Sequence, residues 1–134
     1  MIFVDSNVPV YLVGSDHPHK VDARRTLERL ASERRRLVTS SEVFQEILRR
    51  YVAIDHRAAI EPAFEVLREV VDDVFAVEER DVFRAKDLLH AHPKLSARDA
   101  LHAAVMRRGE ISEIVSFDGG FDEVAGIKRL PGAP

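Results

Sequence analysis

Three aspartates occupy positions at which carboxylates could do chemistry together. Asp5 and Asp118 each follow a short apolar run, and Asp99 is the one charge between Arg98 and Arg107 in an alanine-rich stretch. If these side chains meet, they repel, by on the order of 3 kcal/mol for two carboxylates about 5 Å apart at an effective dielectric constant near 20. A cluster of this kind either binds a cation or keeps some of its members protonated, with raised pKa values.

Each aspartate also has an ordinary structural explanation, because aspartate often caps helices and forms turns. Asp99 and Ser96 form the pattern S-x-x-D, a variant of the capping box, and an acid in the first turn suits the helix dipole. The two interpretations of Asp99 predict opposite effects on stability. A capping acid stabilises its helix by about 0.3–1 kcal/mol, whereas a member of a crowded acid cluster destabilises the protein when no cation is bound.

Short apolar runs alternate with helical segments along the chain, which predicts an α/β fold. Asp55 is a candidate helix cap, and Pro62 either kinks the helix that follows or marks its true start. Strands are expected at Ile2–Val4, Leu37–Thr39, Asp73–Val77 and Glu113–Phe117, with Ile127–Leu130 as a candidate fifth. Helices are expected at Asn7–Val13, Val21–Arg35, from Ser40 or Ser41 to about Val52, Asp55–Val70, Asp81–Ala91 and Ser96–Gly109.

This alternation predicts a mostly parallel sheet with helices on both faces, and it places a site at the carboxyl ends of the strands. Asp5 and Asp118 follow such ends. Asp99, Ala103 and Met106 share one stripe of their helix, and small apolar residues cover the opposite side, so we expect this helix to be buried. Asp99 is then expected to lie near the other two aspartates.

The composition suits one globular domain. The chain has 134 residues, of which 46% are hydrophobic and 32% charged, and its net charge is −3, so any basic surface for nucleic acid must be local. Cysteine is absent, which excludes disulfides and a thiolate zinc site. The N-terminal residues MIFVD show no export signal or membrane anchor, so we expect a cytoplasmic location.

Four motifs carry a resemblance to a known family: DSNV, SEVFQEILRRY, LSARDALHAAVM and SFDGGFDEV. Together they resemble the PIN-domain nucleases, and within them the VapC-type toxins of bacterial toxin–antitoxin pairs, from Met1 to about Leu130. The resemblance implies one three-layer α/β/α domain over residues 1–134, with a central, mostly parallel sheet of four or five strands. It also implies an endoribonuclease that hydrolyses RNA phosphodiester bonds with a water activated by Mg²⁺ or Mn²⁺.

Carried over residue by residue, the resemblance implies four catalytic acids: Asp5, Glu46, Asp99 and Asp118. It implies that Asp5, Asp99 and Asp118 are the metal ligands. Carboxylate oxygens are the hard ligands that Mg²⁺ and Mn²⁺ prefer, so histidines and thiols are not required.

Three further residues are candidates for supporting roles near the metal or the substrate. Asn7, two residues after Asp5, could orient a ligand or a water, or could simply cap a helix. Ser116 stands where the family often has a small hydroxyl residue, two positions before the last catalytic acid. Asp122 lies close by in the sequence and is a candidate accessory acid.

Glu46 is assigned by the resemblance, which places a glutamate within V-F-Q-E-I-L. By spacing alone, Glu46 and Glu42 both lie off the apolar stripe of their helix, as solvated acids do. Glu42, one turn earlier, therefore stays open as the alternative.

The cations and histidines give weaker indications. Arginines at 34–36, 49–50 and 107–108 lie late in helices, where positive charge suits the dipole. Arg98 adjoins Asp99 and could reach the rim of the site. His102, three residues after Asp99, could face it, but a structural role is the expectation for this histidine.

The resemblance further implies a homodimer and a small VapB-type antitoxin that blocks the site. The apolar helices between Ser41 and Val71 are candidates for these contacts, or they simply pack in the core. Two other functions are open. The chain could be a catalytically inactive PIN-fold module that binds RNA or protein. A phosphatase of the haloacid-dehalogenase type would need a second aspartate where Asn7 stands.

Overall fold

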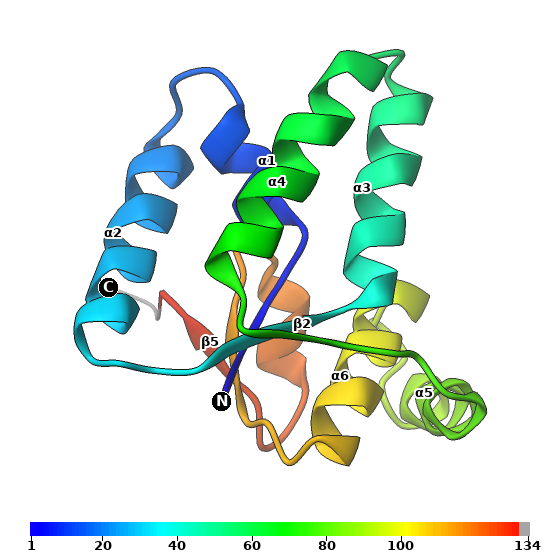
Figure 1. Cartoon of the computed structure of the whole chain (residues 1–134). Helices are drawn as coiled ribbons and strands as arrows, with labels where there is room; N and C mark the ends of the chain where they lie inside the picture. The colour runs from blue at the N-terminus through cyan, green and yellow to red at the C-terminus, as the bar shows by residue number, and fades with distance from the viewer. Residues whose placement is uncertain (132–134) are drawn as a thin grey trace.

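The computed structural model of the chain describes residues 1–131, and one parallel sheet forms its centre (Figure 1). The strands lie in the order β3-β2-β1-β4-β5, and every pair is parallel. β1 therefore lies between β2 and β4, and the residues that follow these three strands leave the sheet at the same edge. The strands are β1 (Ile2–Val4), β2 (Leu37–Ser40), β3 (Asp73–Phe75), β4 (Glu113–Val115) and β5 (Lys128–Leu130).

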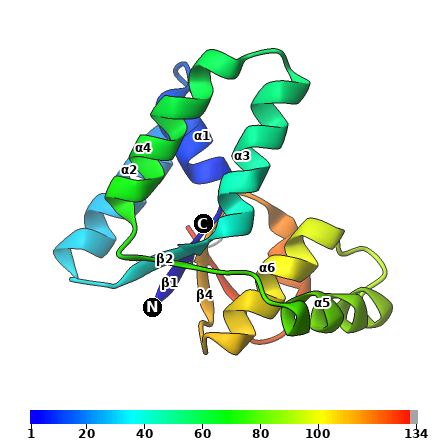
Figure 2. The same cartoon turned by 45° about the vertical axis from the view of Figure 1, so that its right-hand side comes forward.

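Helices cover both faces of this sheet, so the predicted three-layer α/β/α architecture is confirmed. Figure 2 shows α1, α2, α3 and α4 together on one side of the strands, and α5 and α6 on the other. No helix within residues 1–131 is both long and apolar enough to span a membrane. The helices are α1 (Asn7–Val13), α2 (Pro18–Ser32), α3 (Ser41–Ala53), α4 (Ile60–Val70), α5 (Glu79–Ala91) and α6 (Ala97–Arg108).

The main core surrounds β1, whose three residues are completely buried. A second, smaller cluster lies between α5 and α6, where small side chains let the two helices lie close together. Its members include Ala100, Ala103 and Ala104 of α6 with Ala85 and Leu88 of α5. The buried helix predicted from the alanine-rich sequence is therefore present, and its first turn carries Asp99.

The predicted helix Val21–Arg35 is displaced, since α2 begins at Pro18 and ends at Ser32. Its start is earlier because His17 caps it: the His17 Nδ1 atom accepts a hydrogen bond from the His19 backbone at 3.0 Å. Its end is earlier because Arg34 takes a left-handed conformation with φ of 57°, which the helix cannot continue through.

The helix predicted from Asp55 also begins elsewhere, so the prediction that Asp55 caps it was wrong. Asp55 has a left-handed φ of 54°, and a 3₁₀ turn at Arg57–Ala59 precedes α4. Pro62 lies in the first turn of α4, where its missing N–H costs no hydrogen bond. Pro62 thus marks the start of this helix and does not kink it.

Three further boundaries differ from the predicted ones by two residues. β3 and β4 end two residues earlier than predicted, at Phe75 and Val115. After β4, the Ser116 hydroxyl bonds to Asp5, so the chain begins its site contacts where the strand stops. α5 starts at Glu79, two residues early, because a capping box forms in which Glu78 and Asp81 bond to each other's backbone.

Candidate active site

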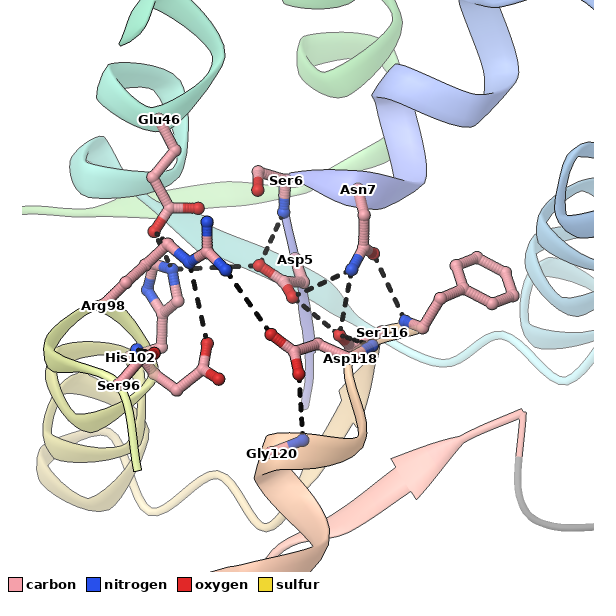
Figure 3. A network of polar contacts seen from close by, with 12 residues as sticks. Asp5, Ser6, Asn7, Glu46, Ser96, Arg98, His102, Ser116, Asp118 and Gly120 are labelled. Carbon is pink, nitrogen blue, oxygen red and sulfur yellow. Dashed lines mark hydrogen bonds and ion pairs between the residues drawn. The ribbon is translucent and has the colours of Figure 1, made fainter. Parts of the chain in front are cut away.

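The four acids predicted as catalytic come from four separate segments and converge at one edge of the sheet. Asp5 follows β1, Glu46 lies on α3, Asp99 on α6, and Asp118 in the loop after β4. Figure 3 shows Asp5, Glu46 and Asp118 pointing toward Arg98 and His102. Asp5, Glu46 and Asp99 are buried, at 4%, 6% and 3% exposure, whereas the Asp118 side chain is 31% exposed. The site is therefore a mostly buried acid cluster with one open side.

Asp5 is held by three hydrogen bonds. Its Oδ1 atom accepts from the Ser6 backbone at 2.7 Å, and its Oδ2 atom accepts from the Ser116 hydroxyl at 2.6 Å and from the Asn7 amide at 3.4 Å. Burial raises the pKa of Asp5, and the nearby charge of Glu46 adds to this rise. Ser116 and Asn7 thus orient the Asp5 carboxylate, while the position before α1 is taken by Ser6 and not by Asn7.

Glu46 is buried against α6, although spacing predicts a solvated acid. Its Oε1 atom lies 2.6 Å from His102 Nε2, and its Oε2 atom has no hydrogen-bond partner within residues 1–131. The spacing argument was wrong because it considers α3 alone, whereas in the fold the side chain of His102 from α6 reaches the Glu46 carboxylate. Glu42, one turn earlier, is only partly buried.

His102 belongs to the cluster, although the sequence analysis expected only a structural role for this histidine. Its ring is completely buried, and Nε2 lies 3.8 Å from Asp5 Oδ1 as well as against Glu46. One ligand-type atom from each of Asp5, Glu46 and His102 lies within 4.8 Å of the others. Burial by itself lowers the pKa of His102, but the hydrogen bond to Glu46 and the neighbouring carboxylates raise it overall. The three-residue spacing from Asp99 was the available signal, since it places both on one helix face.

The backbone and the carboxylate of Asp99 have different roles. The Asp99 N–H donates to the Ser96 hydroxyl at 3.1 Å, so the helix is capped through the main chain. The carboxylate instead faces the cluster, where its buried Oδ1 atom has no hydrogen-bond partner in the described part of the chain. Burial raises the pKa of Asp99 to about 7, helped by the Asp118 and Asp5 carboxyls, while Arg98 lowers it.

Asp118 is fixed close to Asp99 by a glycine. The Gly120 N–H donates to Asp118 Oδ1 at 2.9 Å, and the Asp118 N–H donates to the Ser116 hydroxyl at 3.0 Å. A Cβ atom at position 120 would lie 2.7 Å from Asp99 Oδ2 and 3.2 Å from Asp118 Oδ1. The backbone can approach both carboxylates this closely only because the residue is glycine.

Asp122, the predicted accessory acid, makes its contacts on the outside of the site. Both of its carboxylate oxygens accept hydrogen bonds from Arg129, each at 3.0 Å, and this pairing lowers the pKa of Asp122. Arg129 also donates to the Ser116 carbonyl at 3.3 Å. The structure therefore links Asp122 to the site through Arg129 and the backbone after β4.

The donor set fits a divalent cation. The acids offer hard oxygen ligands, and two of the buried oxygens, Glu46 Oε2 and Asp99 Oδ1, have no hydrogen-bond partner within residues 1–131. The raised pKa values of Asp5 and Asp99 indicate that the cluster is short of positive charge. A bound cation would satisfy the free oxygens and allow these carboxyls to ionise.

Arg98 is an internal cation that reaches three of the four acids. Its guanidinium lies 3.9 Å from Glu46 Oε1, 3.8 Å from Asp99 Oδ1 and 3.5 Å from Asp118 Oδ2. The Arg98 side chain is 51% exposed, so it can leave the cluster without disturbing the core.

Replacing Arg98 with alanine is expected to tighten Mn²⁺ binding and to lower the stability of the metal-free protein. The guanidinium repels an incoming cation, and without a metal it partly neutralises the acids. Because Arg98 is half-exposed, we expect an effect of about 1 kcal/mol, or roughly fivefold in Mn²⁺ affinity. Calorimetric Mn²⁺ titration and melting in chelator measure both effects. Arg107→Ala, on the same helix, is the control, and weaker Mn²⁺ binding by Arg98→Ala would contradict the prediction.

Comparison with known proteins gives consistent matches. The family model described as the PIN domain matches residues 2–127. Ribonuclease VapC13 of Mycobacterium tuberculosis and a VapC ribonuclease of Mycobacterium bovis are each 57% identical over 130 residues, covering 97% of this chain and 99% of each relative. The solved structure of VapC20 from M. tuberculosis, described as a Sarcin-Ricin loop cleaving toxin, aligns with a TM-score of 0.71 at 28% identity, over 91% of this chain and 93% of that one. VapBC2 from Rickettsia felis, solved with a DNA fragment, shares the fold with a TM-score of 0.73 at 16% identity, over 96% and 97% of the two chains.

Proposed function

The chain belongs to the PIN domain family and is a ribonuclease of its VapC group, and from this premise we propose that Asp5, Asp99 and Asp118 hold Mg²⁺ or Mn²⁺ for RNA hydrolysis. The observation that carries the proposal is the convergence of four acids, in which two buried carboxylate oxygens have no hydrogen-bond partner within residues 1–131. Membership of this family removes the phosphatase alternative. The sequence agrees, because a haloacid-dehalogenase phosphatase needs an aspartate two residues after Asp5, and Asn7 occupies that position.

The residues around the metal position have distinct proposed roles. A bound divalent cation supplies positive charge for the phosphate and a water that is acidic enough to attack at neutral pH. Ser116 and Asn7 keep Asp5 in one orientation, so it is ready to bind without rearranging. His102 holds Glu46 by one carboxylate oxygen and leaves the other able to accept a proton from a water. Arg98 is in reach of an added negative charge at the open side of the site.

RNA needs a positive surface, and the net charge of −3 requires that surface to be local. A pocket of about 290 Å³ opens beside Glu46, and its lining includes Arg49, Arg50 and Arg98. The sequence analysis explained Arg49 and Arg50 by their favourable interaction with the helix dipole. Because both also line this pocket, we propose a second role for them. We assign them to the RNA backbone on the α3 side of the acids.

For its partners, we propose that the protein is the toxin of a pair, a homodimer that a small VapB-type antitoxin inhibits. Three large apolar side chains on and just after α3 are exposed: Leu48 at 38%, Val52 at 45% and Ile54 at 57%. This surface adjoins the arginine-lined pocket, so an antitoxin bound there would also cover the entrance to the acids. An enzyme that cleaves cellular RNA acts where the RNA is, and we therefore place it in the cytoplasm.

Cleavage of RNA by the wild-type protein and by Asp5→Asn tests the proposed reaction. We expect cleavage with Mg²⁺ or Mn²⁺, none in chelator, and a loss of at least about 100-fold in Asp5→Asn, since a metal ligand contributes several kcal/mol. The new RNA ends are mapped, and Mn²⁺ is expected to raise the melting temperature of the wild type more than that of the variant. A wild-type protein that binds Mn²⁺ but cleaves no RNA would instead favour an inactive binding module.

A further inference from the structure

Four aromatic rings from three segments form one group on the α1 side of the acids, here called the aromatic platform: Tyr11, His17, His19 and Phe117. His19 stacks on Phe117 with ring centres 4.4 Å apart and planes 19° apart. Tyr11 lies 4.9 Å from His17, 5.0 Å from His19 and 5.4 Å from Phe117. The platform therefore joins α1, the start of α2 and the loop after β4.

The platform lies at the surface and is already fixed in place. Tyr11, His19 and Phe117 are partly buried, while His17 is exposed, so aromatic faces are available from solvent. The His17 ring cannot turn freely because its Nδ1 atom caps α2 by accepting from the His19 N–H at 3.0 Å. A ligand that stacks on these rings would find them ordered before it binds, which lowers the entropic cost of binding.

Direct connections link the platform to the acid cluster. Phe117 stands between Ser116 and Asp118 in the chain, and its N–H donates to Asn7 Oδ1 at 3.3 Å. The same Asn7 side chain donates to Asp5 Oδ2. Figure 3 shows the Asn7 amide in contact with both Asp5 and Ser116, at the start of the loop that carries Asp118. Asn7 therefore ties the segment that carries Phe117 to Asp5, which connects the platform to the acids on the α1 side.

A cationic pocket lies on the far side of His17. It measures about 480 Å³, and its lining includes two cations, Lys20 and Arg24, and one acid, Asp16, together with Pro18 and Val21. Lys20 is held by donating to the Gly14 carbonyl at 2.8 Å, and Arg24 is exposed. Aromatic faces beside positive charges are the combination that binds a base and a phosphate of single-stranded nucleic acid.

We propose that the aromatic platform binds an RNA base next to the scissile phosphate, and that Lys20 and Arg24 contact the phosphate beyond it. The proposal rests on the ribonuclease function proposed above and adds a subsite to it. The arginine-lined pocket lies on the α3 side of the acids and the platform lies on the α1–α2 side. A single strand bound to both would cross the acids between them.

Base stacking is measured with the full chain carrying Asp5→Asn, which binds RNA without cutting it. The probe is a short single-stranded oligoadenylate with a fluorescent adenine analogue, whose emission is quenched when the analogue stacks. Adding Tyr11→Leu or His17→Asn is expected to abolish the quenching and to weaken binding by roughly 5- to 100-fold. Tyr11→Phe keeps the ring and is expected to bind like the parent. His17→Asn keeps the helix cap, because asparagine is also a good capping residue.

Phe83→Leu is the matched control, because it removes an aromatic ring that is 55% exposed on α5, outside the platform. It is expected to change neither quenching nor affinity. In the cleavage-competent protein, Tyr11→Leu and His17→Asn should raise KM by a similar factor and leave kcat unchanged. If the wild-type protein cleaved RNA but both variants kept the quenching and the affinity of the parent, the platform would not be a base-binding site, and the proposed function would still hold. If the wild-type protein cleaved no RNA, the proposed function would be wrong. The quenching measured in the Asp5→Asn protein would still show whether a base stacks on the platform.

Discussion

Replacing Asp99 with asparagine is expected to stabilise the metal-free protein and at the same time to abolish RNA cleavage. The Asp99 carboxylate is buried beside Asp118 and Asp5, and its Oδ1 atom has no hydrogen-bond partner in the described part of the chain. Asparagine has almost the same shape but no charge. The helix cap survives, because it uses the Asp99 backbone and the Ser96 hydroxyl. Cleavage should fall by at least about 100-fold, since the variant lacks one of the three carboxylates that we propose as metal ligands.

The gain in stability should depend on pH in a definite direction. Burial and the neighbouring carboxyls raise the pKa of Asp99 from 3.8 to about 7 in the folded protein. Between these values the folded state retains a proton that the unfolded state has lost, so the free energy of unfolding falls as pH rises through this window. Burial raises the pKa of Asp5 as well, which acts in the same direction.

Asp99→Asn removes its share of this pH dependence. In chelator at a pH of about 8, we expect the variant to be more stable by about 1–2 kcal/mol. One pKa unit corresponds to about 1.4 kcal/mol, but solvent at the open side of the site screens part of the repulsion, and the buried asparagine amide has a desolvation cost of its own. At a pH of about 3, below the unfolded-state value of 3.8, the wild-type carboxyl is mostly protonated in both states, and the difference should nearly vanish. Chemical denaturation at the two pH values gives the comparison.

Asp122→Asn is the matched control for stability. Its carboxylate is paired with Arg129, and this pairing lowers its pKa, so its loss should not stabilise the protein at either pH. If Asp99→Asn were instead less stable than the wild type in chelator, the Asp99 carboxylate would be stabilising helix α6 and would not be repelled by the other acids.

The second large effect is expected from Glu46→Gln, compared with Glu42→Gln on the same helix. Glutamine can keep a hydrogen bond to His102 but removes the negative charge and the basic oxygen from the site. We expect a loss of at least about 100-fold in single-turnover cleavage for Glu46→Gln. Glu42 is one turn away and only partly buried, so its variant should cleave like the wild type.

Mn²⁺ titration of both glutamine variants separates two roles for Glu46. If Glu46 accepts a proton from water, its variant should still bind Mn²⁺ while cleavage is lost; if it is a ligand, affinity should fall as well. Normal cleavage by Glu46→Gln, or an equal loss in Glu42→Gln, would remove Glu46 from the site.

Much of the fold follows from local patterns in the sequence. Short apolar runs between helical segments predict parallel strands, and the five expected strands all occur, with boundaries within two residues. The positions of Asp5 and Asp118 after β1 and β4 follow from the same pattern, because parallel strands end at one edge. The burial of α6 follows from its apolar residues on every side. Boundaries set by one side chain, such as the cap at His17, were missed.

By itself, the sequence determined the parallel sheet, the buried helix and the three aspartates that meet at the strand ends. Only the tertiary structure decided which glutamate joins them and how their charge is balanced. Periodicity describes one helix at a time, so it placed Glu46 in solvent. In the fold the Glu46 carboxylate is buried and meets the His102 side chain, which comes from α6. The sequence argument allowed only a bound metal or protonation of the acids, whereas the fold adds Arg98 as an internal cation and His102 as a partner of Glu46. Contacts between segments so far apart in the chain exist only once the core has brought them together.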